Sequence, residues 1–366
     1  MADCLLKRLS YRGLRNDAKI AFDDRFRMVS DYLSASVKNT LLANPNLVND
    51  AQSAMNLIVC DGIVVGRNML MPTKLKIQDK YFFAQSGGSY EICDKFRGQG
   101  LGTKSFKDSI YNSEYDTYIG QLYSSTAAAI VKKLGLIIFE LPSFYKLCNS
   151  RILFETKGFK GLPLKLCAAC ANLALKFIDI PNIYRLKKIR KRFSVQKLYS
   201  VPKWVNEITL HDGHEFMEVH DTHWLQWCLD YKFTSHPRDR QSFFAVYDKQ
   251  GSPKGFFMTK ERFEKKQGVY RNIVRGTVVE WGSFDENLLN EADLNLMAFF
   301  SFDKDVDNIT TVLSNRSHEN KMKRMGFIRH GSYQMSIKPG QTCECDELCN
   351  QDKWRIRYGG CNTIIY

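Results

Sequence analysis

The sequence lacks the features that mark secreted and membrane-spanning chains. Its first residues, MADCLLKRLSYRG, contain neither the apolar core nor the small-residue cleavage site of a secretory signal. No uninterrupted apolar run reaches the length of about 18 residues that a membrane span needs. The nearest approach, residues 162–180, is interrupted by Lys165, Lys176 and Asp179. These absences favour a cytoplasmic location.

Cysteines are numerous, but they lack the spacing of a disulfide framework. There are 11 of them, an odd number, and Cys4, Cys60, Cys93, Cys148 and Cys228 are scattered along the chain. Such scatter is typical of reducing compartments, where thiols stay free. We therefore expect free thiols rather than disulfides.

A metal-ligand pattern is also missing. Zinc sites are usually built from paired Cys-x-x-Cys knuckles or closely spaced histidines. The C-terminal cysteines form no such pairs, and the histidines, which all fall at or after residue 211, match no established spacing. We predict no metal site and expect the histidines in loops and on the surface; zinc on the C-terminal thiols is the minor alternative. The residues concerned are Cys343, Cys345, Cys349, Cys361, His211, His214, His220 and His223.

Length and charge narrow the function classes. The 366 residues suggest two domains, and 44% hydrophobic with 25% charged residues is a globular composition rather than disorder or coiled coil. The net charge of +14 favours anionic partners: phosphorylated cofactors, nucleic acid or acidic lipid. Because the chain has no RNA-binding, zinc-finger or helix-turn-helix signature, we do not expect nucleic acid as a partner.

Two short patterns recur at nearly the same distance. Residues 59–66, VCDGIVVG, and 246–255, VYDKQGSPKG, each predict a strand, a glycine-containing turn and a returning strand. Residues 133–135, KLG, have a counterpart in RMG at 324–326. The distances from Gly66 to Gly255 and from Gly135 to Gly326 are 189 and 191 residues, which suggests two copies of one fold.

A different kind of sequence connects the copies, at about residues 156–200. Residues 162–178 are rich in helix formers. Residues 185–192, RLKKIRKR, then carry six positive charges in eight positions. We interpret the segment as a connecting helix followed by a solvated basic stretch. The alternative is a peripheral membrane contact in which residues 185–192 lie on anionic lipid.

The motif with the clearest chemical meaning lies at residues 90–110. A strand is expected to end near Cys93, the sequence RGQGLG follows at 97–102, and a helix then begins with residues 101, 105, 106 and 110 on one face. Glycines at such a junction let the backbone approach an anion, which the helix N–H groups and dipole attract. Arg97 adds a forked positive charge. This pattern predicts a pyrophosphate-binding turn.

Other glycine-rich motifs fit less well. A Rossmann fingerprint needs G-x-G-x-x-G, whereas the glycines here stand at 98, 100 and 102. A P-loop needs a lysine directly after its last glycine, and Lys104 lies two residues after Gly102. A protein-kinase loop needs a downstream H-R-D sequence, and no histidine occurs before His211.

The pattern Arg97-x-x-Gly100-x-Gly102 resembles the R/Q-x-x-G-x-G/A acetyl-CoA signature of the GNAT acyltransferase superfamily. The context agrees: residues 59–66, 81–93 and 118–123 match the family's strands in order, and residues 124–136 resemble its N-x-x-A-x-x-x-Y-x-x-x-G-F segment. The resemblance covers about residues 5–145 and, through the duplication, 200–338. It implies that acetyl-CoA, or another short acyl-CoA, binds the turn, with the backbone of Ile92 and Cys93 holding pantetheine and polarising the thioester. The implied turn residues are Arg97, Gly98, Gln99, Gly100, Leu101, Gly102 and Thr103.

Departures from the family pattern limit what can be carried over. Val131 stands where the family often has a tyrosine that protonates the departing thiolate, and Ser124 stands where it often has asparagine. The second copy has Asn315 and Met322 at these positions, and it has no glycine between Gly282 and Gly326. We therefore expect the second copy not to bind CoA and instead to shape the acceptor side, as in tandem members such as the N-myristoyltransferases.

Direct transfer to an amine also requires a proton acceptor. Glu91, on the signature strand, is the carboxylate candidate for the base, and its structural alternative is an exposed strand glutamate. Tyr123, at the end of the fifth strand, is the candidate substitute for the missing acid, and its alternative is a packing aromatic. The terminal carboxylate of Tyr366 is a third option, because some tandem relatives use their C-terminus as base.

The sequence thus predicts an α/β protein of two tandem GNAT-like domains, each a mixed, twisted sheet flanked by helices. The expected parts are a signature-bearing domain at 1–155, a basic helical linker at 156–200, a degenerate copy at 201–340 and a cysteine-containing tail at 341–366. The expected activity is acetyl transfer from acetyl-CoA to an amine of a small molecule, an amino-sugar or a peptide. This acceptor would lie between the copies, within reach of Glu280 and Trp281. The alternative is a non-catalytic GNAT-like module whose basic surface binds nucleic acid or anionic lipid. The oligomeric state is left open.

Overall fold

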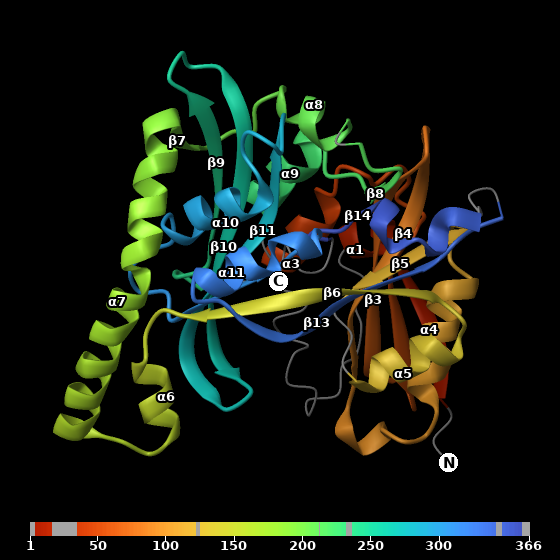
Figure 1. The fold of residues 1–366 in the computed structure, drawn as a ribbon. Helices are drawn as coiled ribbons and strands as arrows, with labels where there is room; N and C mark the ends of the chain where they lie inside the picture. Colours follow the sequence, from red (N-terminus) through yellow and green to blue (C-terminus); the bar gives the residue numbers. More distant parts are fainter. Residues whose placement is uncertain are drawn as a thin grey trace.

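The chain folds into two halves that share one long mixed sheet (Figure 1). The computed structural model describes residues 4–16, 35–121, 125–211, 213–231, 236–341 and 346–360. The first half contains β1 (Cys4–Ser10), α1 (Tyr11–Arg15), α3 (Ala35–Leu42), β2 (Ser53–Cys60), β3 (Ile63–Ile77), β4 (Lys80–Ile92), α4 (Leu101–Tyr111), β5 (Thr117–Gln121), α5 (Ser125–Lys133) and β6 (Ile137–Leu147).

Two helices, α6 (Arg151–Thr156) and α7 (Gly161–Arg192), connect the halves. β7 begins at Phe193, so the last residues of the predicted 156–200 linker belong to the second half's sheet. The second half contains β7 (Phe193–Leu198), α8 (Val205–Thr209), β8 (Phe216–Glu218), α9 (Thr222–Asp230), β9 (Arg240–Asp248), β10 (Pro253–Gln267), β11 (Tyr270–Ser283), α10 (Glu291–Phe299), β12 (Asn308–Val312), α11 (Glu319–Arg324), β13 (Ile328–Lys338) and β14 (Trp354–Arg355).

The strand pairings of the halves confirm the duplication. In the first half β1 to β4 pair antiparallel in order and β4 pairs parallel with β5. In the second half β7, β9, β10 and β11 do the same, and β11 pairs parallel with β12. The recurring glycines also match in conformation: φ is +79° at Gly62 and +84° at Gly251 in the hairpin turns, and +74° at Gly135 and +81° at Gly326 after the helices. Each is a left-handed position that favours glycine.

The last strand of each half completes the sheet of the other half. β13 pairs antiparallel with β5, and β6 pairs antiparallel with β12. β6 and β13 also pair with each other at the centre. One hydrophobic core therefore crosses the boundary and joins Ile119 and Phe139 to Phe257 and Trp281. The two copies are fused, and the predicted ranges 1–155 and 201–340 exchange a strand.

A disulfide links the first two strands, contrary to the expectation of free thiols. Cys4 and Cys60 are directly opposite each other in the antiparallel pair of β1 and β2 and are disulfide-bonded. They are 56 residues apart in sequence. Spacing could not reveal this pair, because only the strand register brings the two thiols together.

The strand exchange predicts that neither half folds alone. A fragment of residues 1–158 retains β6 but lacks β13 and β12, so β5 and β6 would keep unpaired edges and exposed apolar faces. We expect this fragment to aggregate or to show no cooperative unfolding, and co-expression with residues 159–366 to recover a one-to-one complex. Light scattering and near-ultraviolet circular dichroism measure both. A monomeric 1–158 fragment that unfolds cooperatively would contradict the prediction.

Candidate functional site

The glycine turn between β4 and α4 has the conformation that the sequence predicts. After β4 the chain makes a short 3-10 turn at Asp94–Phe96, and Gly98 and Gly100 adopt φ of +79° and +76°. A Cβ built on either glycine would have no atom within 4 Å. The glycines are thus required by backbone conformation, and the space beside them is open to a ligand.

The start of α4 offers its backbone N–H groups to that space. Gly100 is the N-cap and provides no side-chain cap, and the first turn contains no acidic residue. The start of α10, the equivalent helix, is different: the Asn290 side chain accepts from the Asp293 N–H, and Glu291 and Asp293 lie in the first turn. Uncapped N–H groups and an uncompensated dipole favour an anion at α4, whereas α10 satisfies and neutralises its own end.

Arg97 lies at the start of the turn and makes only local contacts, with Ile92 and Asp94. Its Nε donates to the Ile92 carbonyl at 3.2 Å, and its Nη1 lies 2.9 Å from Asp94 Oδ1. The two side chains are 65% and 86% exposed, so the ion pair contributes little. Breaking this pair to bind a phosphate would therefore cost little free energy.

The end of β4 extends beyond its pairing with β5. The two strands are paired only from Ala84 to Gly87, and a bulge with Ser89 at φ +48° follows. β5 ends at Gln121, so residues 88–92 of β4 extend beyond this pairing toward the glycine turn, and we call the space beside them the wedge. Within it, the Cys93 N–H already donates to Val65 O at 2.8 Å, and Ile92 O accepts from Arg97.

Gly102 is required for a reason that spacing does not reveal. A Cβ there would lie 2.1 Å from the hydroxyl oxygen of Tyr90, so only glycine lets this side chain reach the first turn of α4. The Tyr90 hydroxyl is buried and has no hydrogen-bond partner among the described residues. Burial raises the pKa of Tyr90, which keeps the hydroxyl protonated and able to donate.

In the second half the corresponding wedge is filled by the chain itself. β11 and β12 pair only from Arg275 to Thr277, and the guanidinium groups of Arg355 and Arg357 occupy the gap beyond. Both donate to the Trp281 carbonyl, at 3.2 and 3.4 Å, and Arg357 also donates to Ser314 Oγ beside β12.

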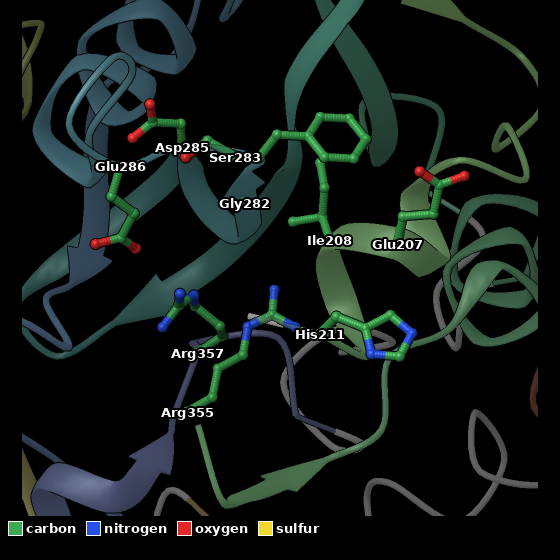
Figure 2. Close-up of a pocket in the computed structure, with 10 residues that line it drawn as sticks. Glu207, Ile208, His211, Gly282, Ser283, Asp285, Glu286, Arg355 and Arg357 are labelled. Carbon is green, nitrogen blue, oxygen red and sulfur yellow. The ribbon is translucent and has the colours of Figure 1, made fainter. Parts of the chain in front are cut away.

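A cavity of about 270 Å³ lies at this closed end. Figure 2 shows both arginines directed toward the end of β11, below Asp285 and Glu286. These two carboxylates precede α10, where the first half has Lys95 and Arg97 before α4. The second half therefore combines an occupied wedge with an acidic approach, and neither suits a pyrophosphate.

Comparison with known proteins places the fold. No protein-family model and no curated protein matches the sequence. Among solved structures, Saccharomyces cerevisiae N-myristoyltransferase with bound myristoyl-CoA matches 92% of this chain and 83% of its own, at a TM-score of 0.56 and 10% identity. A conserved Enterococcus faecalis protein of unknown function matches 91% and 72% (TM-score 0.51, 11% identity). A GCN5-related N-acetyltransferase from Anabaena variabilis matches 92% and 72% (TM-score 0.50, 8% identity).

The chain has the GNAT fold. Each half is GNAT-like, as the sequence resemblance implied, and the tandem arrangement covers nearly the whole chain. At these identities the likeness shows the fold alone, so the chemistry must be argued from the residues of this chain.

Of the residues predicted to move protons in the first GNAT-like half, Glu91 is the one that the structure describes. Its carboxylate lies 3.3 Å from Arg67 Nη2 across the β3–β4 pair and is 28% exposed. Tyr123 and Tyr366 lie outside the described residues. Val131 and Met322 stand at the family's tyrosine position in the two halves, and both are buried. Because neither side chain carries an ionisable proton, neither can act as a general acid.

A histidine cluster that sequence reasoning placed on the surface lies partly in the interior. His220 is 4% exposed, contrary to that expectation. Its Nδ1 contacts Glu280 Oε2 and its Nε2 lies 3.3 Å from Glu218 Oε2. Its ring stacks on that of Trp224, with 5.6 Å between the ring centroids. In the sequence, Glu218 and His220 follow the apolar pair Phe216 and Met217. This pattern is compatible with a surface loop and with the buried end of a strand, so it does not predict that His220 is buried.

This network joins the GNAT-like halves. Glu218 accepts from Thr73 of β3 at 2.7 Å and from Gln121 of β5 at 3.0 Å, and Glu280 of β11 accepts from Arg355 at 3.0 Å. Glu280 is fully buried, as is Trp281 at 1% exposure, so they are sealed inside rather than lining an open acceptor groove as expected.

The network also sets a pH dependence. Burial by itself would lower the pKa of His220, but the Glu280 and Glu218 carboxylates outweigh it and raise that pKa from 6.5 to about 9. Because the pKa of His220 is raised in the folded state, the protonated ring stabilises the folded protein fully below pH 6.5. This stabilisation is lost as the pH rises through about 9.

We expect H220Q to lower the free energy of unfolding by about 3 kcal/mol at neutral pH, because buried Glu218 then has no cation beside it among the described residues and Glu280 keeps only its arginine partners. The deficit should shrink above pH 9. Denaturant titrations across this range measure both effects. The control is H223Q, an exposed residue on α9. Equal pH profiles for H220Q and the parent would refute the assignment.

Proposed function

We propose that the protein is an acyl-CoA-dependent N-acyltransferase whose first half binds the CoA. The observation that carries the proposal is the asymmetry between the helices: α4 begins at a left-handed glycine with uncapped N–H groups and no acid, whereas α10 is capped and acidic. Two copies of one fold differ at the one place where this fold would receive a pyrophosphate. A purely structural duplication would not require that difference.

The residues present fit an acyl-CoA. The N–H groups of residues 98–103 would receive the pyrophosphate, Arg97 would leave its exposed pair with Asp94 to join it, and the wedge beyond Gly87 would admit the pantetheine. The bound CoA would supply an activated thioester. Arg97 and the helix N–H groups would orient it, and Glu91 would accept the proton of the attacking amine.

The acyl group and the acceptor are the finer parts of the proposal. We propose acetyl-CoA, and we propose an amine of a small molecule, an amino-sugar or a peptide as acceptor. The similar yeast enzyme carries myristoyl-CoA in its crystal structure, so the longer chain must be compared directly. A cytoplasmic location also belongs to the proposal, and the Cys4–Cys60 disulfide is the feature that weighs against it.

Binding of CoA can be tested at Gly100. G100D places a carboxylate and a strained left-handed residue in the turn, so we expect CoA affinity to fall at least about a hundredfold. Titration calorimetry with CoA, acetyl-CoA and myristoyl-CoA measures the effect and ranks the acyl chains. The matched control is G158D: Gly158 also has positive φ, at +85°, with nothing within 4 Å of an added Cβ. Equal CoA affinity in the two variants would remove the assignment.

Proton transfer can be tested at Glu91. If its carboxylate accepts the proton of the amine, E91Q should lower kcat/KM by about a hundredfold and leave the affinity for CoA unchanged. Release of free CoA in a screen of amino-sugars, polyamines, aminoglycosides and peptides provides the assay. E140Q, an exposed glutamate on β6, is the control. A parallel loss of CoA affinity or of folding stability would instead assign Glu91 a structural role with Arg67.

A further inference from the structure

The outward face of α7 exposes many apolar residues that no other part of the described chain covers. The helix has 32 residues and runs along one side of the molecule, in light green at the left of Figure 1. By length and composition it could cross a membrane, and only 6% of its apolar window is buried. Charged residues interrupt the apolar run, as the sequence shows, but the helix is still long and apolar enough to span. The exposed apolar residues are Leu162, Leu166, Leu173, Phe177, Ile178, Ile180, Ile183 and Tyr184, at 39–68% exposure.

The opposite face of α7 holds the helix against the protein. Asp179 pairs with Lys146 of β6, and Asn182 donates to the Met325 carbonyl at 3.1 Å. Arg185 lies 2.6 Å from Asp293 of α10, and Leu186 is buried in the main core. A helix that crossed a bilayer would have to give up these polar contacts. α7 can instead contact a membrane along its length, with the folded body on its other side.

Positive charge continues directly from the apolar face. Residues 185–192 contain six cations, and Lys187, Lys188, Arg190, Lys191 and Arg192 are exposed. Cations beside an exposed apolar face suit an anionic lipid surface, because headgroups attract the charges while acyl chains cover the apolar residues. A second copy of this chain, the other candidate to cover the face, would gain nothing from the basic run.

We propose that α7 is an interfacial membrane helix that binds anionic bilayers. Its outward residues between 162 and 184 enter the boundary between headgroups and acyl chains. Lys165 and Lys176, which lie on exposed turns of this segment, extend their ammonium groups to the headgroups. Residues 185–192 remain among the headgroups. The proposal is independent of the CoA site, because α7 and α4 belong to different parts of the fold.

Vesicle flotation of the full chain tests the proposal. We expect binding to phosphatidylcholine vesicles containing about 30% phosphatidylserine and at least about tenfold weaker binding to pure phosphatidylcholine. The double variant L166E/F177E should lose binding to both. The matched control V48E/V269E adds the same charge at residues that are 65% and 68% exposed elsewhere, and it should bind like the parent. A control that lost binding equally would overturn the assignment to α7.

The basic run is tested separately. K188E/R190E/K191E should retain the fold by circular dichroism and lose the preference for anionic vesicles. Resistance to alkaline carbonate extraction would indicate a spanning helix and overturn the interfacial placement. Light scattering provides the other decisive outcome: a dimer of the parent that L166E/F177E dissociates, without vesicle binding by the parent, would assign the face to a second copy.

Discussion

The antiparallel pairing of β6 with β13 is the constraint on which the rest of the structure depends. Each strand leaves its own half and completes the other, so the boundary between the copies lies inside a continuous sheet. Main-chain hydrogen bonds and a common core therefore fix the relative position of the halves, where a flexible linker would not. A ligand held by the first half meets the second half at a set distance.

In the second copy the chain's own side chains occupy the positions that a ligand would need. Its wedge is closed by Arg355 and Arg357, and its Glu280 joins a buried network with His220. A buried network of this kind is expensive unless every member is satisfied, which favours one arrangement over others. The second half therefore contributes buried contacts to the sheet that it shares with the first half.

Local features of the fold and site were predictable from the sequence, and non-local ones were not. The glycine turn, the repeat and the buried face of α4 follow from spacing over a few residues, and Ser105, Phe106 and Ile110 are buried as periodicity predicted. The exchange of β6 and β13 depends on pairing between distant segments, which periodicity does not encode.

Residue type also does not determine which side chains are buried. His220 was expected on the surface and lies in the interior. Most large apolar residues of α7 between 162 and 184 could have belonged to a core helix and are exposed instead. Gly102 belongs to the predicted phosphate motif, and its closeness to Tyr90 gives it a packing role as well. Each case turns on what lies opposite the residue in space, and one sequence does not contain that information.

The direct junction of α7 and β7 has a mechanical consequence. α7 ends at Arg192 and β7 begins at Phe193, with no spacer that could act as a swivel. β7 pairs with β9, so the helix is continuous with the edge of the sheet. If α7 binds a membrane as proposed, the whole protein would keep one fixed orientation relative to the membrane plane. It would diffuse in two dimensions and present the glycine turn at a constant height, so that only substrates located within that layer would meet it.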